Sequence, residues 1–175
     1  MEKIEELKDK LETSRPEDWE LIPDIDLYMD QVISYMTRQH IGLEMDDEEE
    51  TLTSAMINNY IKSGLLPRAK GKRYSREHIG YLTAICLLKQ VLSVTETGTL
   101  LSNQMDHRDI KDFYKNYNQV LDEEYNKVAG CIKKNASEEE LAQIALKLAV
   151  SSYAQKLACK EILRAITPEN KDKND

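Results

Sequence analysis

The sequence has little of what interrupts a helix: six glycines and four prolines occur in 175 residues, together with a single phenylalanine. Leucine, glutamate and lysine are abundant instead. Glycine and proline are the poorest helix formers, whereas leucine, glutamate and lysine are among the best. The composition therefore favours helix over sheet and predicts a mainly all-α fold.

Cysteine is also scarce, and its pattern argues against the common metal and redox motifs. The three cysteines stand far apart in apolar helical contexts; they are Cys86, Cys131 and Cys159. None belongs to a CxxC or cysteine–histidine ligand pattern, so each is expected to behave as a small hydrophobe. We predict no metal site and no cofactor.

Catalytic motifs are missing as well. His40, His78 and His107 have no serine, cysteine or carboxylate partner at a catalytic spacing, and neither a glycine-rich phosphate loop nor an HExxH motif is present. We therefore predict no catalytic residues and no enzymatic activity. His78 stands near the start of a predicted helix, where we interpret it as a cap or core residue.

No stretch approaches the roughly 20 consecutive apolar residues that a membrane-spanning helix needs. The first residues, MEKIEELKDKLE, form a charged amphipathic segment without the apolar core of a signal peptide. We predict a cytoplasmic protein that does not contact a membrane.

Charge is distributed unevenly along the chain. Residues 51–95 contain seven basic residues and one acid, a net charge of +6, whereas the whole chain carries −8. The seven are Lys62, Arg68, Lys70, Lys72, Arg73, Arg76 and Lys89. A basic segment in an acidic protein is typical of a nucleic-acid reader, whose affinity comes largely from phosphate neutralisation. The alternative is an ordinary solvated charge cluster.

Helical signals divide the chain into four parts. Residues 1–23 are expected to form a short amphipathic helix, a break at Pro16 and a hydrophobic anchor around Trp19. Residues 24–103 hold several shorter helices, residues 104–168 hold two long ones, and residues 169–175 form a disordered tail. The acidic run at 45–50 is expected to be a solvated loop.

The helix predicted at 53–63 has an unusual outer face. Thr53 can cap this helix and Gly64 can end it. At about 100° per residue, one face collects apolar side chains, namely Leu52, Met56, Ile57, Tyr60 and Ile61. The opposite face collects small, amide and cationic side chains: Ser54, Ala55, Asn58, Asn59 and Lys62. Amides can read adenine edges in a major groove and lysine can bind phosphate or guanine, so this face is a candidate recognition surface.

The next segment, 67–74, predicts a two-stranded basic wing. Gly71 stands at the centre of a turn between two short extended pieces. Its candidate contacts to DNA are Arg68, Lys70, Lys72, Arg73 and Tyr74. Helices are predicted from Ser75 to about Leu92 and then, after a capping box at Ser93, through Leu101.

Two long helices are predicted at the C-terminal end. The first carries one apolar stripe from Ile110 to Ile132, and the second runs from a capping box at Ser137 to about Ile166. We expect these helices to hold a homodimer together. The stripe expected to contribute comprises Phe113, Tyr117, Leu121, Tyr125 and Val128. A further hypothesis is a pocket for a small-molecule effector with aromatic walls, whereas the alternative is that the rings fill the core. Its tyrosines would be Tyr114, Tyr117, Tyr125 and Tyr153.

The order of two helices, Gly-Leu-Leu-Pro, a basic hairpin and a Tyr-Ser helix start resembles the MerR-type winged helix-turn-helix. The matching strings are MINNYIKSGLLP at 56–67 and GKRYS at 71–75. Over roughly residues 23–101, the strings YMDQVISYM, MINNYIKSGLLP, KRYSREHI and LLKQVLSVTE are also similar to the bacterial family catalogued as domain of unknown function 1836. The first resemblance implies a DNA-binding module with a small wing, and the second implies a fold without an assigned activity.

Three features depart from the MerR-type pattern. Asn58 and Asn59 replace an arginine–tyrosine pair that contacts phosphates in that superfamily. Lys72 stands where the wing usually has arginine, and the loop at 42–51 is longer and acidic.

Two functional hypotheses follow from these patterns. The first is a transcriptional regulator that binds double-stranded DNA through the helix 53–63 and the wing 67–74. The second is a helical protein–protein interaction module that retains the winged fold without binding DNA, which the isoelectric point of about 5.0 favours. For the first hypothesis the site residues are Thr53, Ser54, Asn58, Asn59, Lys62, Arg68, Lys70, Lys72, Arg73 and Tyr74.

Overall fold

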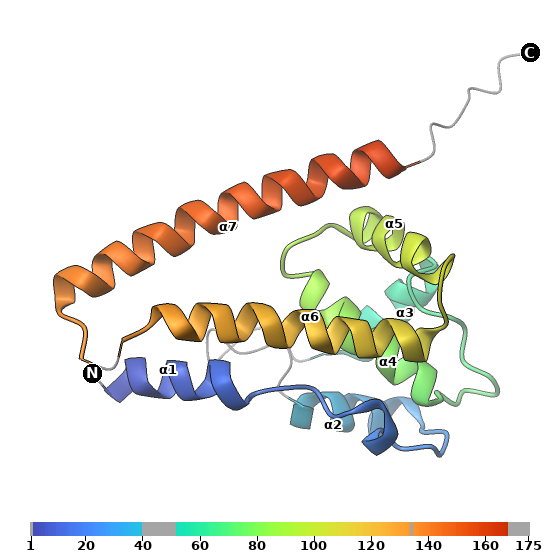
Figure 1. Ribbon diagram of the computed structural model, residues 1–175. Helices are drawn as coiled ribbons and strands as arrows, with labels where there is room; N and C mark the ends of the chain where they lie inside the picture. The colour runs from blue at the N-terminus through green and yellow to red at the C-terminus, as the bar shows by residue number, and fades with distance from the viewer. Residues whose placement is uncertain (1, 40–51, 134, 168–175) are drawn as a thin grey trace, which may run out of the picture.

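The computed structural model describes residues 2–39, 52–133 and 135–167. These residues form seven α-helices and one short 3-10 helix (Figure 1). The elements are α1 (Glu2–Thr13), η1 (Trp19–Leu21), α2 (Met29–Gln39), α3 (Ser54–Lys62), α4 (Arg76–Leu88), α5 (Val94–Met105), α6 (Ile110–Cys131) and α7 (Glu138–Ile166). The predicted mainly helical fold is confirmed. The predicted loop at 45–50 and tail at 169–175 lie outside the described residues.

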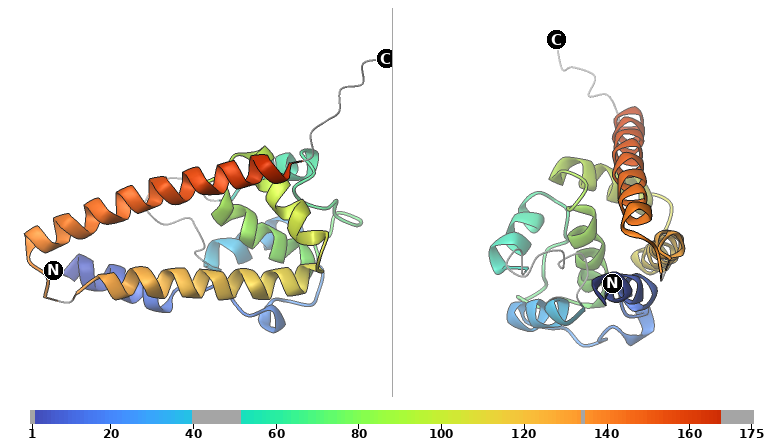
Figure 2. Two further views of the ribbon diagram at one scale, coloured as in Figure 1. Left: turned by 45° about the horizontal axis from the view of Figure 1, so that its top comes forward. Right: turned by 90° about the vertical axis from the view of Figure 1, so that its left-hand side faces the viewer.

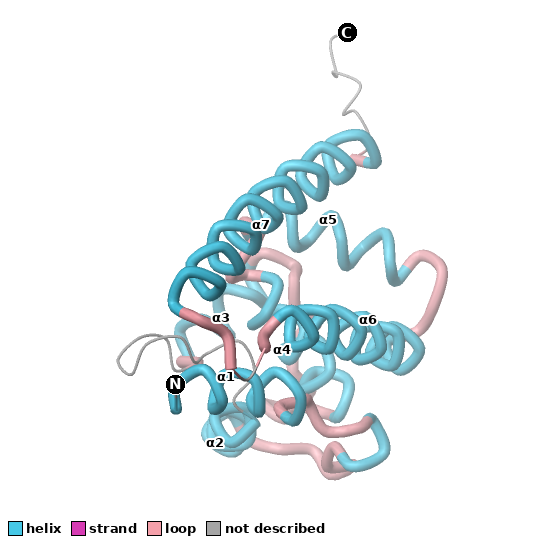
Figure 3. The backbone as a smooth tube through the Cα atoms, turned by 60° about the vertical axis from the view of Figure 1, so that its left-hand side comes forward, coloured by secondary structure: helices cyan, strands magenta, loops and turns pink. Residues whose placement is uncertain are grey.

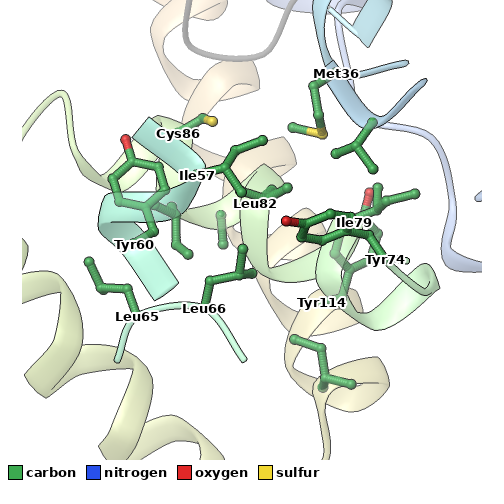
Figure 4. Packing of buried hydrophobic residues seen from close by; sticks show 14 of the residues in the cluster. Met36, Ile57, Tyr60, Leu65, Leu66, Tyr74, Ile79, Leu82, Cys86 and Tyr114 are labelled. Atoms are coloured by element: carbon green, nitrogen blue, oxygen red, sulfur yellow. The ribbon is translucent and has the colours of Figure 1, made fainter. Parts of the chain in front are cut away.

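One cluster of buried side chains holds most of these elements together. The cluster extends along the chain from Trp19 to Tyr114 and draws on η1, α2, α3, α4, α5 and α6. Figure 4 shows part of it, including Ile57 of α3, Leu82 of α4 and Tyr114 of α6. α4 is its centre, because eight of its 13 residues are buried. α6 packs along α4, and α1 packs along α6. Residues from all three predicted helical parts of the chain therefore share one packed body.

Side-chain caps begin three helices where the sequence predicts them. Thr53 accepts a backbone N–H bond at 3.2 Å and so begins α3. Ser93 and Glu96 exchange hydrogen bonds of 3.2 and 2.8 Å at the start of α5. Ser137 and Glu140 do the same at 3.2 and 2.9 Å at the start of α7. Each pair satisfies backbone N–H groups that a helix start leaves free.

Two helix ends differ from the prediction. α4 ends at Leu88 rather than near Leu92, because the backbone N–H groups of Gln90 and Val91 turn to carbonyls three residues back, at 3.0 Å each. This tightening places Leu92 in the interior. α5 continues to Met105, beyond the predicted end.

The predicted two-stranded wing is not seen, because the described residues form no strand (Figure 3). Lys70 and Arg73 exchange backbone hydrogen bonds of 3.1 and 3.0 Å as an isolated antiparallel bridge. Gly71 and Lys72 between them have φ angles of 57° and 62°. Positive φ at both central residues is the signature of a two-residue type I′ turn. The predicted turn at Gly71 is therefore present, but the two strands predicted on either side of it are not seen in the described residues.

The turn does not extend into a hairpin because the residues that follow are already engaged. Tyr74 exchanges two backbone hydrogen bonds of 2.9 Å with Leu27, which precedes α2. The backbone N–H of Ser75 donates to Nδ1 of His78 at 3.0 Å, so α4 begins at once. A longer hairpin, in which residues 74–75 paired with residues 67–69, would need the backbone N–H group of Ser75 for a hydrogen bond between the two strands. The interpretation of His78 as a cap and core residue is confirmed, since it is buried.

The apolar stripe of α6 is covered by the chain's own helices. Phe113 and Leu121 are buried, and α4 and α1 pack along this helix. Arg15, just after α1, adds a hydrogen bond of 2.8 Å to Asp122. Intramolecular packing therefore covers much of this stripe, and the expectation that the C-terminal helices hold a homodimer together stays a prediction.

α7 contrasts with α6 because it lies at the edge of the molecule (Figure 1 and Figure 2, right). Leu163 is the single buried residue of its 29. One ion pair, between Lys160 and Glu96 at 3.0 Å, joins its second half to α5. Most of α7 is thus open to solvent in the single chain.

Candidate nucleic-acid interface

The two faces of α3 differ as the sequence predicts. Leu52 and Ile57 are fully buried and Tyr60 is nearly so, which fixes the inner face against the core. The outer residues are all exposed: Thr53, Ser54, Asn58, Asn59 and Lys62. Because the apolar side sets the orientation of the helix, these outer side chains point away from the body without needing contacts of their own.

The segment that follows α3 projects from the end of the molecule opposite the N-terminus (Figure 2, left). Its start is anchored, since Leu65 and Leu66 are buried and their backbone N–H groups donate to the carbonyl of Tyr60. Gly64, at a φ of 78°, ends the helix as predicted. Beyond this anchor the predicted cations Arg68, Lys70, Lys72 and Arg73 are all exposed. We call these four, together with Lys62, the basic surface.

Arg73 is positioned by a residue that the sequence did not single out. Its Nη2 donates to the hydroxyl of Tyr28 at 2.9 Å, and its guanidinium lies 4.8 Å from the centre of that ring. The backbone pair of Leu27 with Tyr74 brings the two side chains together, because residues 28 and 73 are the next neighbours across it. The two residues are 45 positions apart, and no local pattern signals their contact.

Tyr74 does not belong to the exposed site. Its side chain is buried among the core residues (Figure 4) and meets the ring of His78 edge-on at 5.4 Å. Burial raises the pKa of the Tyr74 hydroxyl. Tyr74 was predicted as a DNA contact, but as a buried side chain it does not share the exposed surface of the other predicted contacts.

The cations of the basic surface are not neutralised by the residues that the structure describes, none of which forms an ion pair with them. Other lysines of the chain do form ion pairs with carboxylates. Lys115 and Lys111 lie 3.0 and 3.3 Å from Glu20, and the hydrogen bond from Lys115 is the main cause that lowers the pKa of this carboxyl to about 2. Among the described residues, then, no carboxylate is paired with the basic surface.

Comparison with known families gives a match over much of the chain. The profile of a family described as a domain of unknown function (DUF1836) matches residues 17–120. The chain belongs to the DUF1836 family. Comparison with curated proteins found no match, and neither did comparison with solved structures. The matched region of this DUF1836 protein contains η1, α2 to α5 and the first half of α6, whereas α1 and α7 lie outside it.

A groove of about 290 Å³ borders the outer face of α3 in this DUF1836 protein. Asn59 and Lys89 contribute its polar edge, and Cys86 contributes to its floor. Burial raises the pKa of the Cys86 thiol to about 12, so the group stays neutral. Among the described residues no three His, Cys, Asp or Glu side chains are arranged to hold a metal ion. Asn58, one residue away, does not line the groove and faces solvent.

Of the four tyrosines expected to wall an effector pocket, Tyr114 and Tyr117 meet, with ring centres 6.3 Å apart. The hydroxyl of Tyr114 donates to the backbone carbonyl of Glu17 at 2.7 Å, inside the core. Tyr125 lies under the guanidinium of Arg15 at 5.0 Å. Tyr153 is 71% exposed on α7. Tyr114 belongs to the core cluster and Tyr117 packs against it, which accords with the core-filling alternative for these two rings.

No described helix of the DUF1836 protein is long and apolar enough to cross a membrane.

Proposed function

We propose that this protein binds double-stranded DNA and acts as a transcriptional regulator, with α3 and the turn at 70–73 as the contact elements. The observation that supports the proposal is the basic surface: five exposed cations without ion pairs to described residues, on a chain of net charge −8. Concentrating positive charge at one end of an acidic protein orients that end toward a polyanion.

α3 and the turn at 70–73 are proposed to make different kinds of contact with DNA, because their exposed groups differ. The outer face of α3 offers amide and hydroxyl groups, which can hydrogen-bond base edges in a major groove. The turn offers charge on a short, tightly bonded loop, which suits phosphate contacts that fix register without reading sequence. The order α2, α3, turn and α4 is also the order that the resemblance to the MerR-type winged helix-turn-helix implies.

The second candidate function is a protein–protein interaction module. The groove beside α3 favours it, because a concave surface with apolar walls and a polar edge can accept a side chain of another protein. The overall acidity of the chain also reduces its attraction to DNA at long range.

Removing two charges from the turn should weaken binding to all duplexes alike. In the variant Lys70→Ala/Lys72→Ala we expect the slope of log affinity against log salt to flatten by about two, because each lost phosphate contact releases about one counterion fewer. Alanine keeps a Cβ at position 72, so the backbone cost of its φ of 62° is unchanged. Arg73 is left intact because its removal would also free Tyr28.

The slope is measured by fluorescence anisotropy with a labelled duplex at several salt concentrations. The matched control, Lys3→Ala/Lys127→Ala, removes two exposed cations near the opposite end of the molecule and should leave the slope unchanged. Equal slopes for the turn variant and the wild type would remove the turn from the interface.

Asn58 should govern which sequence is preferred. We expect Asn58→Ala to relax discrimination at one base pair by about 1–3 kcal/mol, because a bidentate amide–adenine contact would be lost there. Affinity for single-position variants of a selected duplex measures the effect. Asn116→Ala is the matched control, since Asn116 is exposed on α6, outside the proposed contact elements. A loss spread equally over every base pair would indicate a backbone contact instead.

A further inference from the structure

α7 carries an exposed row of large apolar side chains along its outer face. The four residues and their exposed fractions are Leu146 (59%), Val150 (61%), Tyr153 (71%) and Leu157 (49%). Their spacings of four, three and four residues keep them on one side of the helix, as in the seam of a coiled coil. We call these four residues the α7 stripe.

Nothing in the described part of the chain covers the α7 stripe. The side of α7 that faces the body is marked by the buried Leu163 and by the half-buried Leu141, Ile144 and Leu148. At about 100° per residue these four residues lie about 110° to 170° from the centre of the stripe, so the stripe is on the opposite side of the helix. Four adjacent large apolar side chains in water are a surface that a partner stabilises.

We infer that the α7 stripe pairs with the same stripe of a second copy of this chain, with the two helices antiparallel. The stripe is symmetric about its midpoint between Ser151 and Ser152. A two-fold axis there places Leu146 opposite Leu157 of the second copy, and Val150 opposite Tyr153 of the second copy. A two-fold interface requires such self-complementarity, because each contact occurs twice.

The charges of α7 select the antiparallel direction. Its first turn holds Glu138, Glu139 and Glu140, whereas its last turns hold Lys160 and Arg164, which pair with Glu96 and Glu161 in the single chain. In the antiparallel register Glu139 stands opposite Arg164 of the second copy, so acidic and basic ends meet. The one like-charge pair in the register sets Lys147 opposite Lys156 of the second copy, on the flank of the helix. A parallel pair would bring the two acidic ends together, which opposes association. The pairing involves neither α3 nor the turn, so it holds whether or not the protein binds DNA.

The first test is the molar mass in solution, measured by sedimentation equilibrium at micromolar concentration. We expect the wild-type chain of 20.2 kDa to sediment as a dimer, and Val150→Glu as a monomer because the charge would be buried against Tyr153 of the second copy. The matched control is Ile162→Glu, which should remain a dimer. Ile162 is 60% exposed on the same helix but lies about 150° from the centre of the stripe.

A wild-type monomer would overturn the inference and assign the α7 stripe to a different protein. A dimer that survives Val150→Glu, or that Ile162→Glu dissociates, would overturn it too. Both positions are exposed in the single chain, so both variants are expected to keep the wild-type circular dichroism.

The second test fixes the direction of the helices by disulfide cross-linking. Leu146→Cys and Leu157→Cys are made separately in a chain whose Cys131 and Cys159 are replaced by serine, then mixed and oxidised. The antiparallel pair predicts mixed disulfides between the two variants and none within either variant alone. Self-disulfides of each variant would show a parallel pair, and equal yields in all combinations would show random collision. Either result would overturn the proposed register.

Discussion

Replacing Trp19 with alanine should lower the free energy of unfolding by about 3–5 kcal/mol. Trp19 is 7% exposed, and its ring lies 5.5 Å from that of Tyr114 on α6. It also fills the space that Gly80 leaves on α4, where an added Cβ would stand 2.8 Å from the indole. The Trp19 side chain thus joins η1 to both α4 and α6. Its removal creates a cavity at their junction, and the backbone around it can close that cavity only in part.

The effect of Trp19→Ala is measured by urea unfolding followed by far-ultraviolet circular dichroism, since the variant has no tryptophan fluorescence. Leu21→Ala in the same short helix is the matched control, because Leu21 is 68% exposed and its truncation should change stability by less than about 0.5 kcal/mol. If Trp19→Ala cost no more than the control, η1 would not be part of the core.

Neutralising the whole basic surface should abolish measurable DNA binding at ordinary salt. The variant replaces Lys62, Arg68, Lys70, Lys72 and Arg73 with glutamine. Five phosphate contacts contribute a counterion-release term of about four orders of magnitude at 0.1 M salt relative to 1 M, so we expect a loss of at least about 1000-fold. All five side chains are exposed, so stability should change little.

The charge-preserving variant distinguishes charge from shape at the same five positions. Exchanging lysine for arginine and arginine for lysine throughout keeps every phosphate contact available, although it removes the fork geometry of two arginines. We expect its affinity in the anisotropy assay to stay within about tenfold of the wild type. If the glutamine variant and the charge-preserving variant lost affinity to a similar extent, the positive charge of these five positions would not be the cause of DNA binding.

The sequence alone predicts the structure correctly where a single residue determines the local backbone. Thr53, Ser93 and Ser137 begin their helices as predicted, because a capping side chain satisfies backbone groups within its own turn. The two faces of α3 were predictable for a similar reason, since helical periodicity alone separates Ile57 from Asn58.

Contacts between distant segments were not predictable in this way. Tyr74 looked like a wing residue, but its backbone pairs with Leu27, 47 positions earlier, and its ring enters the core. The same pairing creates the contact between Arg73 and Tyr28. The stripes of α6 and α7 were both apolar, and only the packing of α1 and α4 decides that the first is covered and the second is not.

The central claim, that the basic surface binds DNA, is tested most directly by measuring the affinity of the wild-type protein for a duplex of arbitrary sequence between about 50 and 200 mM salt. With five cations in contact, log affinity should fall linearly with log salt, with a slope of about −4 to −5 for each protomer that touches the duplex. Failure to bind at the lowest salt, or an affinity that does not change across the series, would contradict the claim.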